Sequence, residues 1–158
     1  MPSGGFRVAV DEWTSADAGR AWDVIVPIDL TTVFTGLKPV IPAVVAVREQ
    51  TGNWDAVGQT RKIDLADGSR TGEIINSCDR PALFTYTVGP FSGPVGKLVD
   101  RAEGEFKFEP MSDGTYVRWT YVWHPRPGGA PIVWVLSKIW RIYARRSILA
   151  LVKLADGR

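Results

Sequence analysis

The sequence predicts an α+β domain in which a curved antiparallel sheet of seven strands wraps around one long C-terminal helix. Three observations support this prediction. Short segments in which apolar and polar residues alternate fill much of the chain, and this period of two is typical of half-buried strands. Turn signals such as Asp67-Gly68 and Asp113-Gly114 separate several of these segments. After Pro131, apolar residues recur at helical spacing as far as Leu154.

One strand and two short helices are expected at the beginning of the chain. Residues 6–11 alternate in polarity and predict the first strand. Ser15 is the expected N-cap of the first helix. The apolar residues of that helix are Ala18, Ala21, Trp22 and Ile25. Pro27 ends or kinks it, and residues 29–34 form a second short helix that stops at Gly36.

Six further strands and the long helix follow. The strands are expected at residues 40–49, 57–65, 70–78, 83–88, 104–109 and 116–124. Residues 89–96 contain three Gly and two Pro, so we expect a loop there. Residues 126–131 break the chain before the helix of residues 132–154. The predicted buried stripe of this helix is Val133, Leu136, Trp140, Tyr143, Ser147, Leu151 and Leu154.

This order of elements predicts a single domain, residues 1–158, with a hollow interior. A long sheet whose apolar face is covered by one amphipathic helix must curl around that helix. The central volume is then easily left partly unfilled. We therefore expect an internal cavity between the sheet and the helix.

Composition and charge exclude several classes of function. The chain has 19 Lys and Arg against 17 Asp and Glu, which gives no strong field for binding nucleic acid, so no nucleic-acid partner is expected. Cys78 and His124 are the only residues of their types. One of each cannot make an internal disulfide or a metal-ligand cluster. No metal and no cofactor are therefore expected.

The ends of the chain bear on location and on membranes. Residues 1–10 lack the charged start and continuous apolar run of a secretory signal, so a cytoplasmic location is expected. Lys138 and Arg141 interrupt the longest apolar stretch, so we expect no transmembrane segment. Arg145 and Arg146 fit the dipole at the C-terminal end of a helix. A membrane-surface patch is the alternative, which leaves peripheral membrane contact open, as is the oligomeric state.

Several short motifs, taken in order, resemble those of one superfamily. They are Ala-Trp-Asp-Val at 21–24, Val-Gly-Gln-Thr-Arg-Lys-Ile at 57–63 followed by Asp67-Gly68, Gly-Glu-Ile at 72–74 and Gly-Thr-Tyr-Val-Arg-Trp at 114–119. In element order and local sequence, nearly the whole chain resembles the SRPBCC or START-like superfamily, which includes the birch-pollen allergen type, polyketide cyclase/dehydrase-like proteins and plant abscisic-acid receptors. The resemblance implies the helix-grip fold and an internal hydrophobic cavity entered through loops beside the C-terminal helix.

The apolar parity of each strand predicts which side chains face this cavity. On residues 57–65, Gln59 and Arg61 share the apolar parity. Parity does not decide the side of Glu73, but the resemblance to receptor-type members, whose acidic residue in this motif faces the cavity, favours an inward position. His124 is expected to point outward near the surface. The predicted ligand-binding residues are Gln59, Arg61, Glu73, Phe84, Tyr86, Phe106, Phe108, Trp119, Tyr121, Trp123, Leu136, Trp140 and Tyr143.

Two interpretations stay open for the polar and aromatic members of this set. Arg61 and Glu73 fit either a buried salt bridge that fixes strand register or a polar anchor for a ligand. Trp22 and Trp140 are expected mainly in the core. Residues such as Trp119 fit either the core or the cavity wall.

Three functions are compatible with this cavity. The first is binding or carriage of a small hydrophobic molecule that is lipid-like, isoprenoid or polyketide-like, entering past residues 89–96 and 126–131. The second is an enzyme of the polyketide cyclase or aromatase type, in which Glu73 or Tyr86 acts as acid or base and Arg61 stabilises an enolate oxygen. The third is a ligand-dependent regulator. The fold alone does not choose among them.

Overall fold

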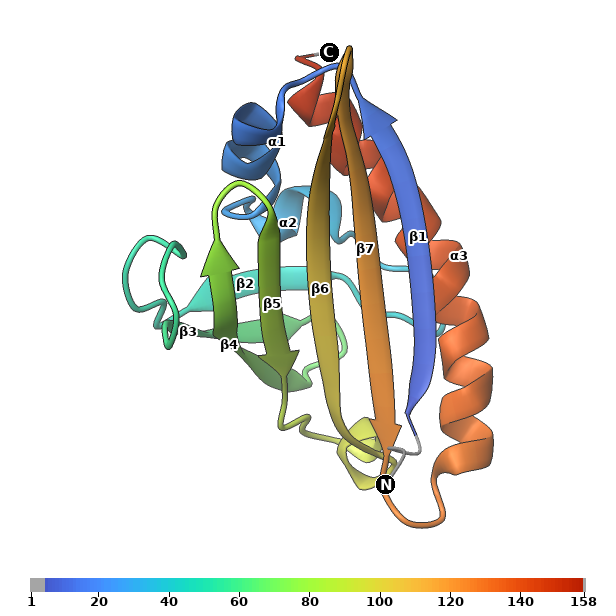
Figure 1. Ribbon diagram of the computed structural model, residues 1–158. Coiled ribbons are helices and arrows are strands. Elements are labelled where there is room, and N and C mark those ends of the chain that lie inside the picture. The colour runs from blue at the N-terminus through green and yellow to red at the C-terminus, as the bar shows by residue number, and fades with distance from the viewer. Residues whose placement is uncertain (1–4, 158) are drawn as a thin grey trace.

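The computed structural model describes residues 5–157, which form one antiparallel sheet and three α-helices (Figure 1). The strands are β1 (Phe6–Thr14), β2 (Val44–Arg48), β3 (Thr60–Leu65), β4 (Arg70–Asp79), β5 (Leu83–Val88), β6 (Val99–Met111) and β7 (Gly114–Pro125). The helices are α1 (Ala18–Ile25), α2 (Leu30–Val33) and α3 (Ala130–Ala155), and a single 3₁₀ turn, η1, covers Pro94–Lys97. The predicted seven-stranded sheet with a long C-terminal helix is confirmed.

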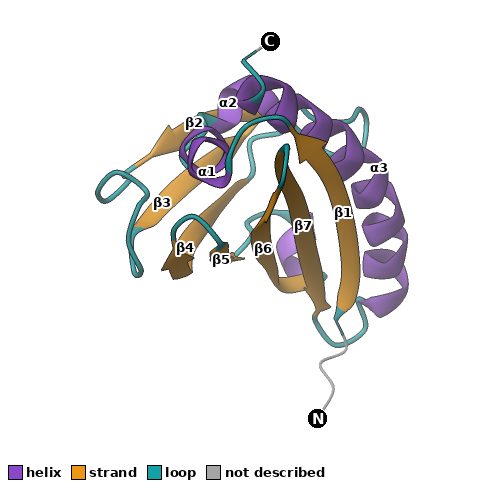
Figure 2. Ribbon diagram, turned by 45° about the horizontal axis from the view of Figure 1, so that its top comes forward, coloured by secondary structure: helices purple, strands orange, loops and turns teal. Residues whose placement is uncertain are grey.

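The strand order is β1-β7-β6-β5-β4-β3-β2, so β2 to β7 form a meander and β1 joins its end beside β7. Figure 2 shows the sheet bending from β1 round to β2, with α3 beside β1 and the two short helices at one end. The C-terminal end of α3 is tied to the β1–α1 connection. The Ser15 amide donates to Asp156 Oδ1 at 2.8 Å, and Arg20 Nε donates to the Ala155 carbonyl at 2.8 Å.

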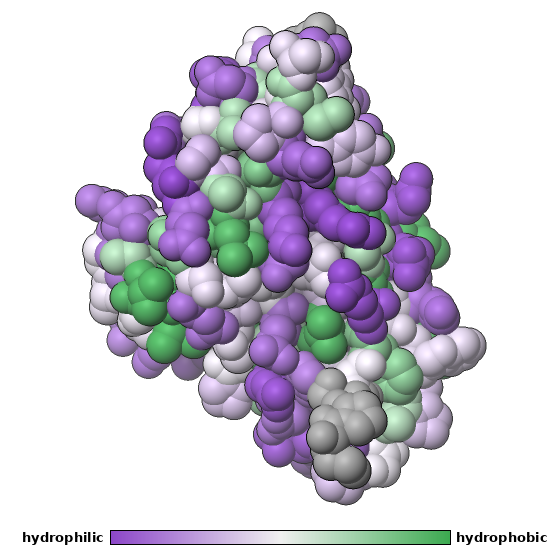
Figure 3. Space-filling view, in the orientation of Figure 1, coloured by the Kyte–Doolittle hydropathy of each residue, from purple (hydrophilic) through white to green (hydrophobic). Residues whose placement is uncertain are grey.

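The inner face of the sheet carries the aromatic residues that parity predicted. Along β7, Trp119, Tyr121 and Trp123 are all buried. Trp22 from α1 packs edge-on against Phe84 at 5.9 Å between ring centroids, which confirms its place in the core. The outer face, seen in Figure 3, is mostly hydrophilic with scattered apolar residues. The alternation therefore separates an aromatic interior from a polar exterior.

Several predicted boundaries were wrong. Ser15 does not cap α1, because Asp17 holds that position and its side chain accepts from the Arg20 amide at 2.8 Å. β2 begins at Val44 rather than at residue 40, because the preceding residues form a tight turn in which the Leu37 amide donates to the Ile41 carbonyl. β3 begins at Thr60 rather than at residue 57, and residues 51–59 form a loop.

Two predictions about exposure were also wrong. Leu154 is exposed and does not belong to the buried stripe of α3. It lies to one side of that stripe, whose last buried residue is Ala155. His124 is buried rather than at the surface. Its Nε2 is in hydrogen-bond contact with Glu103 Oε1 on the neighbouring strand β6, so its ring has a polar partner on the outer side of the sheet.

Candidate ligand-binding cavity

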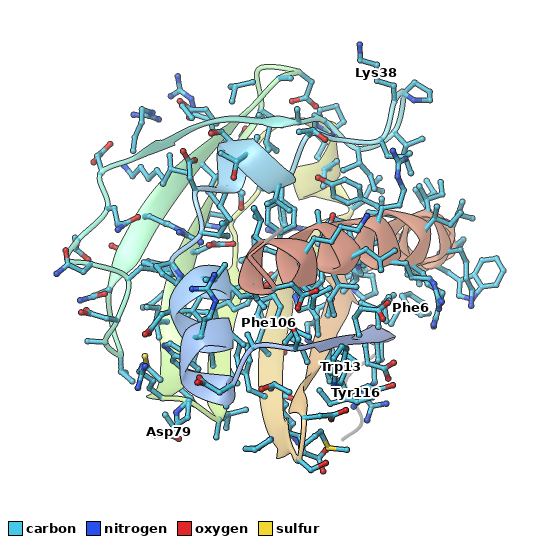
Figure 4. The ribbon with its side chains drawn as sticks, turned by 90° about the horizontal axis from the view of Figure 1, so that it is seen from above. Phe6, Trp13, Lys38, Asp79, Phe106 and Tyr116 are labelled. Carbon is cyan, nitrogen blue, oxygen red and sulfur yellow. The ribbon has the colours of Figure 1, made fainter. Side chains whose placement is uncertain are left out.

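A cavity of about 190 Å³ lies between the inner face of the sheet and the helices. Its walls come from α1, α2, strands β2 to β7 and the inner face of α3. In Figure 4, which looks down on the molecule, Phe106 lies on the side of the sheet toward α3, whereas Trp13 and Tyr116 lie together outside. Most predicted site residues line this cavity, namely Arg61, Glu73, Phe84, Tyr86, Phe106, Trp119, Tyr121, Trp123, Leu136, Trp140 and Tyr143.

Gln59 lies outside the cavity, so its predicted inward position was wrong. Its Oε1 accepts from the Asp55 amide at 2.7 Å, and its Nε2 donates to Asp55 Oδ1 at 3.0 Å. Strand parity does not apply to Gln59 because β3 begins one residue later. The side chain instead organises the loop before the strand.

Phe108 is also absent from the cavity wall. Its ring is buried against Trp22 at 5.4 Å and against Phe106 at 6.2 Å between centroids. Strand parity correctly predicted that Phe108 faces inward, but α1 covers this end of β6 and fills the space inside it. Phe108 is therefore a core residue under α1.

The polar end of the cavity is built around Arg61 and Glu73. The β3–β4 register places these residues directly opposite each other, and Arg61 Nε and Nη2 lie 2.8 and 2.7 Å from Glu73 Oε1. The two side chains are 6% and 10% exposed, so the pair is almost fully withdrawn from water. Both short contacts end on Oε1, so Glu73 Oε2 accepts no hydrogen bond from residues 5–157.

Trp54 covers the other side of the Arg61 guanidinium, and sequence reasoning missed it. The guanidinium carbon lies 4.0 Å from the centre of the indole, a cation–π contact in a buried setting. Trp54 has a φ of 60°, which lets the loop turn its side chain inward. Only the turn signal at Gly52 and Asn53 marked this loop in the sequence.

Two tyrosine hydroxyls lie near this pair. Tyr86 accepts a hydrogen bond from Trp119 Nε1 at 3.1 Å, so the proton of its own hydroxyl is available. The Tyr121 hydroxyl makes no hydrogen bond to any of residues 5–157. Burial raises the pKa of Tyr86 and of Tyr121, and the negative charge of Glu73 adds to both shifts. Both hydroxyls are therefore neutral at physiological pH and can donate hydrogen bonds.

The remaining wall is aromatic and apolar. The ring centroids of Tyr121 and Trp140 are 4.6 Å apart, and Trp140 also meets Trp123 at 5.3 Å. Phe34, which follows α2 and was not predicted, packs 5.8 Å from Trp119. The Tyr143 hydroxyl accepts from the Gly36 amide at 3.2 Å and so ties α3 to this segment.

Three further hydrogen-bonding groups of cavity-lining residues have no partner in the described chain. They are Thr71 Oγ1, Trp123 Nε1 and Trp140 Nε1. Buried polar groups without partners are uncommon in native proteins, and a bound ligand is one way to satisfy them. Across residues 5–157, no three His, Cys, Asp or Glu side chains come together as metal ligands.

The two predicted entrance loops contribute unequally to the wall of the cavity. Phe91, Ser92 and Val95 line it from the Gly/Pro-rich segment that was predicted as an entrance, and Val40 lines it from the turn before β2. Residues 126–131, the second predicted entrance loop, contribute no residue to its wall. Among residues 5–157, no helix is long and apolar enough to cross a membrane.

Known structures share this arrangement of sheet and helices. CV1439 from Chromobacterium violaceum has a TM-score of 0.67 and 16% identity, over 99% of each chain. The chain has the helix-grip fold. Norcoclaurine synthase from Thalictrum flavum shares it with a TM-score of 0.63 and 18% identity, over 93% of this chain and 87% of the enzyme. Ara h 8.0201 shares it with a TM-score of 0.62 and 15% identity, over 98% and 99%.

At such low sequence identities, the structural similarity shows the helix-grip fold and nothing finer. No protein-family profile and no curated protein matches the sequence. The helix-grip fold that the resemblance implied is confirmed through three-dimensional structure. A shared fold leaves the chemistry to be argued from the cavity itself.

Proposed function

We propose that this protein binds or carries a small hydrophobic molecule in the helix-grip cavity, with the polar group of the ligand at the Arg61–Glu73 end. One observation supports this most directly. Unused hydrogen-bonding groups, Glu73 Oε2 and the Tyr121 hydroxyl among them, belong to residues that line an otherwise largely aromatic and apolar cavity. Ligand sites commonly combine an apolar wall with a few such groups that fix orientation. In this proposal Arg61 and Glu73 are both a structural pair and an anchor.

The size of the cavity limits the ligand. At about 190 Å³, it is closer to the ~150 Å³ cavity that accepts benzene than to the ~300–1,000 Å³ of typical ligand sites. A ring bearing a hydroxyl, amine or carbonyl fits as the structure stands. A longer lipid, isoprenoid or polyketide-like ligand requires α3 or the entrance segment to move outward.

Intrinsic fluorescence tests this proposal, with 2-naphthol as a probe that carries an apolar ring and a hydroxyl. We expect saturable quenching of tryptophan emission in the wild-type protein. Trp140→Phe weakens binding because Trp140 lies in the wall. Trp134→Phe is the matched control, because Trp134 lies on the same helix but faces solvent. Equal effects of the two substitutions would contradict binding in the cavity. Native mass spectrometry of protein from its own cells then identifies a retained ligand.

A second candidate is a cyclase or aromatase-type enzyme that uses the same cavity. The neutral hydroxyls of Tyr86 and Tyr121 beside Glu73 favour it, since such groups move protons. Norcoclaurine synthase is an enzyme by name and has the same fold. Glu73→Ala and Tyr86→Phe separate the two functions. An enzyme loses turnover far more than ligand affinity, whereas a carrier loses affinity alone.

The cytoplasmic location belongs to the same proposal. Cys78 is a free thiol in the described chain. Free thiols and the absence of disulfides are usual where the compartment is reducing. Fractionation of the source cells tests this location.

A further inference from the structure

The outward face of α3 has an unusual composition for a surface helix. The helix carries five of the 19 basic residues of the chain and none of its 17 acidic residues. The rest of the sequence is therefore net acidic, and positive charge is concentrated on one element. In the orientation of Figures 1 and 3, α3 forms the right edge of the molecule, where apolar and hydrophilic side chains lie next to one another.

An apolar row runs along this outward face. Val135, Ile142 and Leu149 are 49%, 57% and 43% exposed. They are seven residues apart, which is close to two helical turns, so they follow one line along the helix. Trp134, which is 50% exposed, lies about 100° round the helix from Val135. It lies beside Lys138, whose Nζ is 5.2 Å from the centre of its ring. Single exposed apolar residues are ordinary on a protein surface, whereas apolar residues aligned along one face of a helix are typical of an interaction site.

Basic side chains flank the apolar row on both sides. Lys138 and Arg145, also seven residues apart, lie along one side, and Arg146 and Lys153 lie along the other. All four are exposed. No carboxylate within residues 5–157 forms an ion pair with any of them, whereas Arg48, Arg61 and Arg80 elsewhere are all paired. The face is thus an apolar line between two unneutralised rows of positive charge.

This pattern argues against a second copy of the chain as the partner. A symmetric dimer through α3 would place the same basic rows against each other with no acidic residue on the helix to compensate. Like charges at close range oppose such an interface. A partner with a negative surface and an apolar layer directly beneath it satisfies both features.

We propose that the outward face of α3 docks on an anionic lipid surface. The apolar row and Trp134 enter the boundary between headgroups and acyl chains, and the basic rows contact lipid phosphates. The opposite face of α3 supplies Leu136, Trp140 and Tyr143 to the cavity wall. One helix therefore joins the membrane face to the cavity, whatever the cavity holds.

Vesicle co-sedimentation tests this proposal with the full-length protein. One set of vesicles contains equal parts of phosphatidylcholine and phosphatidylglycerol, and the other contains phosphatidylcholine alone. We expect binding to the anionic vesicles, weakened at high salt, and at least about tenfold weaker binding to the neutral ones, since each basic residue near an anionic surface adds to the attraction. Equal binding to both, or binding to neither, would overturn the proposal.

Paired variants locate the binding face. Ile142→Ser/Leu149→Ser removes most of the apolar row, and Lys138→Glu/Arg145→Glu reverses one basic row. Each is expected to reduce anionic vesicle binding by at least about tenfold. The matched controls are Val57→Ser and Arg118→Glu, which change exposed residues of the same kinds on the loop before β3 and on the outer face of β7. Neither control should change binding.

Two further measurements distinguish membrane docking from misfolding and from self-association. Circular dichroism checks that the variants fold, as expected for substitutions at exposed positions. Sedimentation velocity without lipid measures the oligomeric state. A dimer that Ile142→Ser/Leu149→Ser dissociates would show that the row serves self-association and would overturn the proposal. Binding of 2-naphthol by the variants reports on the cavity separately, so failure of membrane docking leaves the proposed ligand binding untouched.

Discussion

The position of the Tyr86 ring depends on a glycine in the neighbouring strand. Gly104 lies opposite Tyr86 on β5 and opposite Tyr121 on β7. A Cβ atom at residue 104 would lie only 2.1 Å from Cζ of Tyr86. The missing side chain therefore provides the space in which the Tyr86 hydroxyl reaches Trp119.

Gly104→Ala should accordingly disturb both stability and the cavity. We expect a loss of about 1–3 kcal/mol in the free energy of unfolding, the usual range for overpacking, measured by urea denaturation. The matched control is Gly72→Ala in β4, where a Cβ would make only ordinary contacts at 3.4 Å and beyond. Similar losses in the two variants would show that general strand effects, not the Tyr86 contact, set the cost.

The Arg61–Glu73 pair can be tested by a double-mutant cycle. Arg61→Met leaves Glu73 buried without its partner and is expected to cost about 3–5 kcal/mol. The double variant Arg61→Met/Glu73→Leu should recover much of this loss, because neither charge is then buried alone. Additive losses would show that the two residues act independently. Loss of 2-naphthol binding in a stable double variant would separate the anchoring role from the structural one.

Strand parity explains which single residues were predictable. Trp119, Tyr121 and Phe84 lie on regular strands, where alternation fixes the side of the sheet. Phe34 ends a predicted helix that is too short to show a buried side, and Phe91 lies in a loop, so no pattern in the sequence pointed them inward. Glu73 was placed only through the family resemblance, because apolar residues occupy both parities of its strand.

At the scale of elements, the β2–β3 edge of the sheet is held by an exposed ion pair. Arg48 Nε and Nη2 donate to the two carboxylate oxygens of Asp64 at 2.6 and 2.9 Å. The hydrogen bond from Arg48 lowers the pKa of Asp64. A carboxyl whose pKa is lower in the folded state stabilises the fold above its ordinary pKa of about 4 and loses this effect as the pH falls through the lowered value.

Asp64→Asn should therefore remove part of the decrease in the free energy of unfolding that the wild-type protein shows at acidic pH. We expect the wild-type urea midpoint to exceed that of Asp64→Asn at neutral pH, and the gap to narrow below about pH 4. Added salt should narrow it at neutral pH as well, because the pair is near the surface. A gap that stays constant from neutral to acidic pH would rule out the charge on Asp64 as its cause.

Element boundaries were less predictable than the elements themselves. Asp-Gly turns at 67–68 and 113–114 marked two hairpins correctly. β6, however, starts at Val99, five residues before the expected position. Its register with β7 shifts between Val99 and Arg101, and such an irregularity breaks the period of two on which the prediction relied.

At the scale of the whole molecule, the fold followed from element order but the cavity volume did not. The order of strands, turns and one terminal helix predicts a curled sheet around that helix. The volume left over depends on how the aromatic rings pack, for example Tyr121 against Trp140. Close packing of such rings leaves about 190 Å³, and no spacing in the sequence encodes that packing.

The two ends of α3 are secured very differently. Its C-terminal half buries Ile148, Leu151 and Ala155 and is hydrogen-bonded to the chain around Ser15. Its N-terminal half buries Val133 in the core, but its first turn follows Gly129, which has no side chain to cap it. Hydrogen exchange should therefore show amide protection rising along α3 toward its C-terminus, measured by mass spectrometry, and uniform protection would contradict this.

The hydrogen bonds at the C-terminal end of α3 make this end the natural fixed point for any outward movement of the helix. Two residues that line the cavity, Leu136 and Trp140, lie in the N-terminal half of the helix, far from these hydrogen bonds. A rotation about this fixed point displaces the N-terminal half of the helix furthest, so the cavity widens most beside Leu136 and least beside Leu151. The free energy needed to move this half of the helix outward, rather than the cavity volume in the present structure, then limits the length of the ligand.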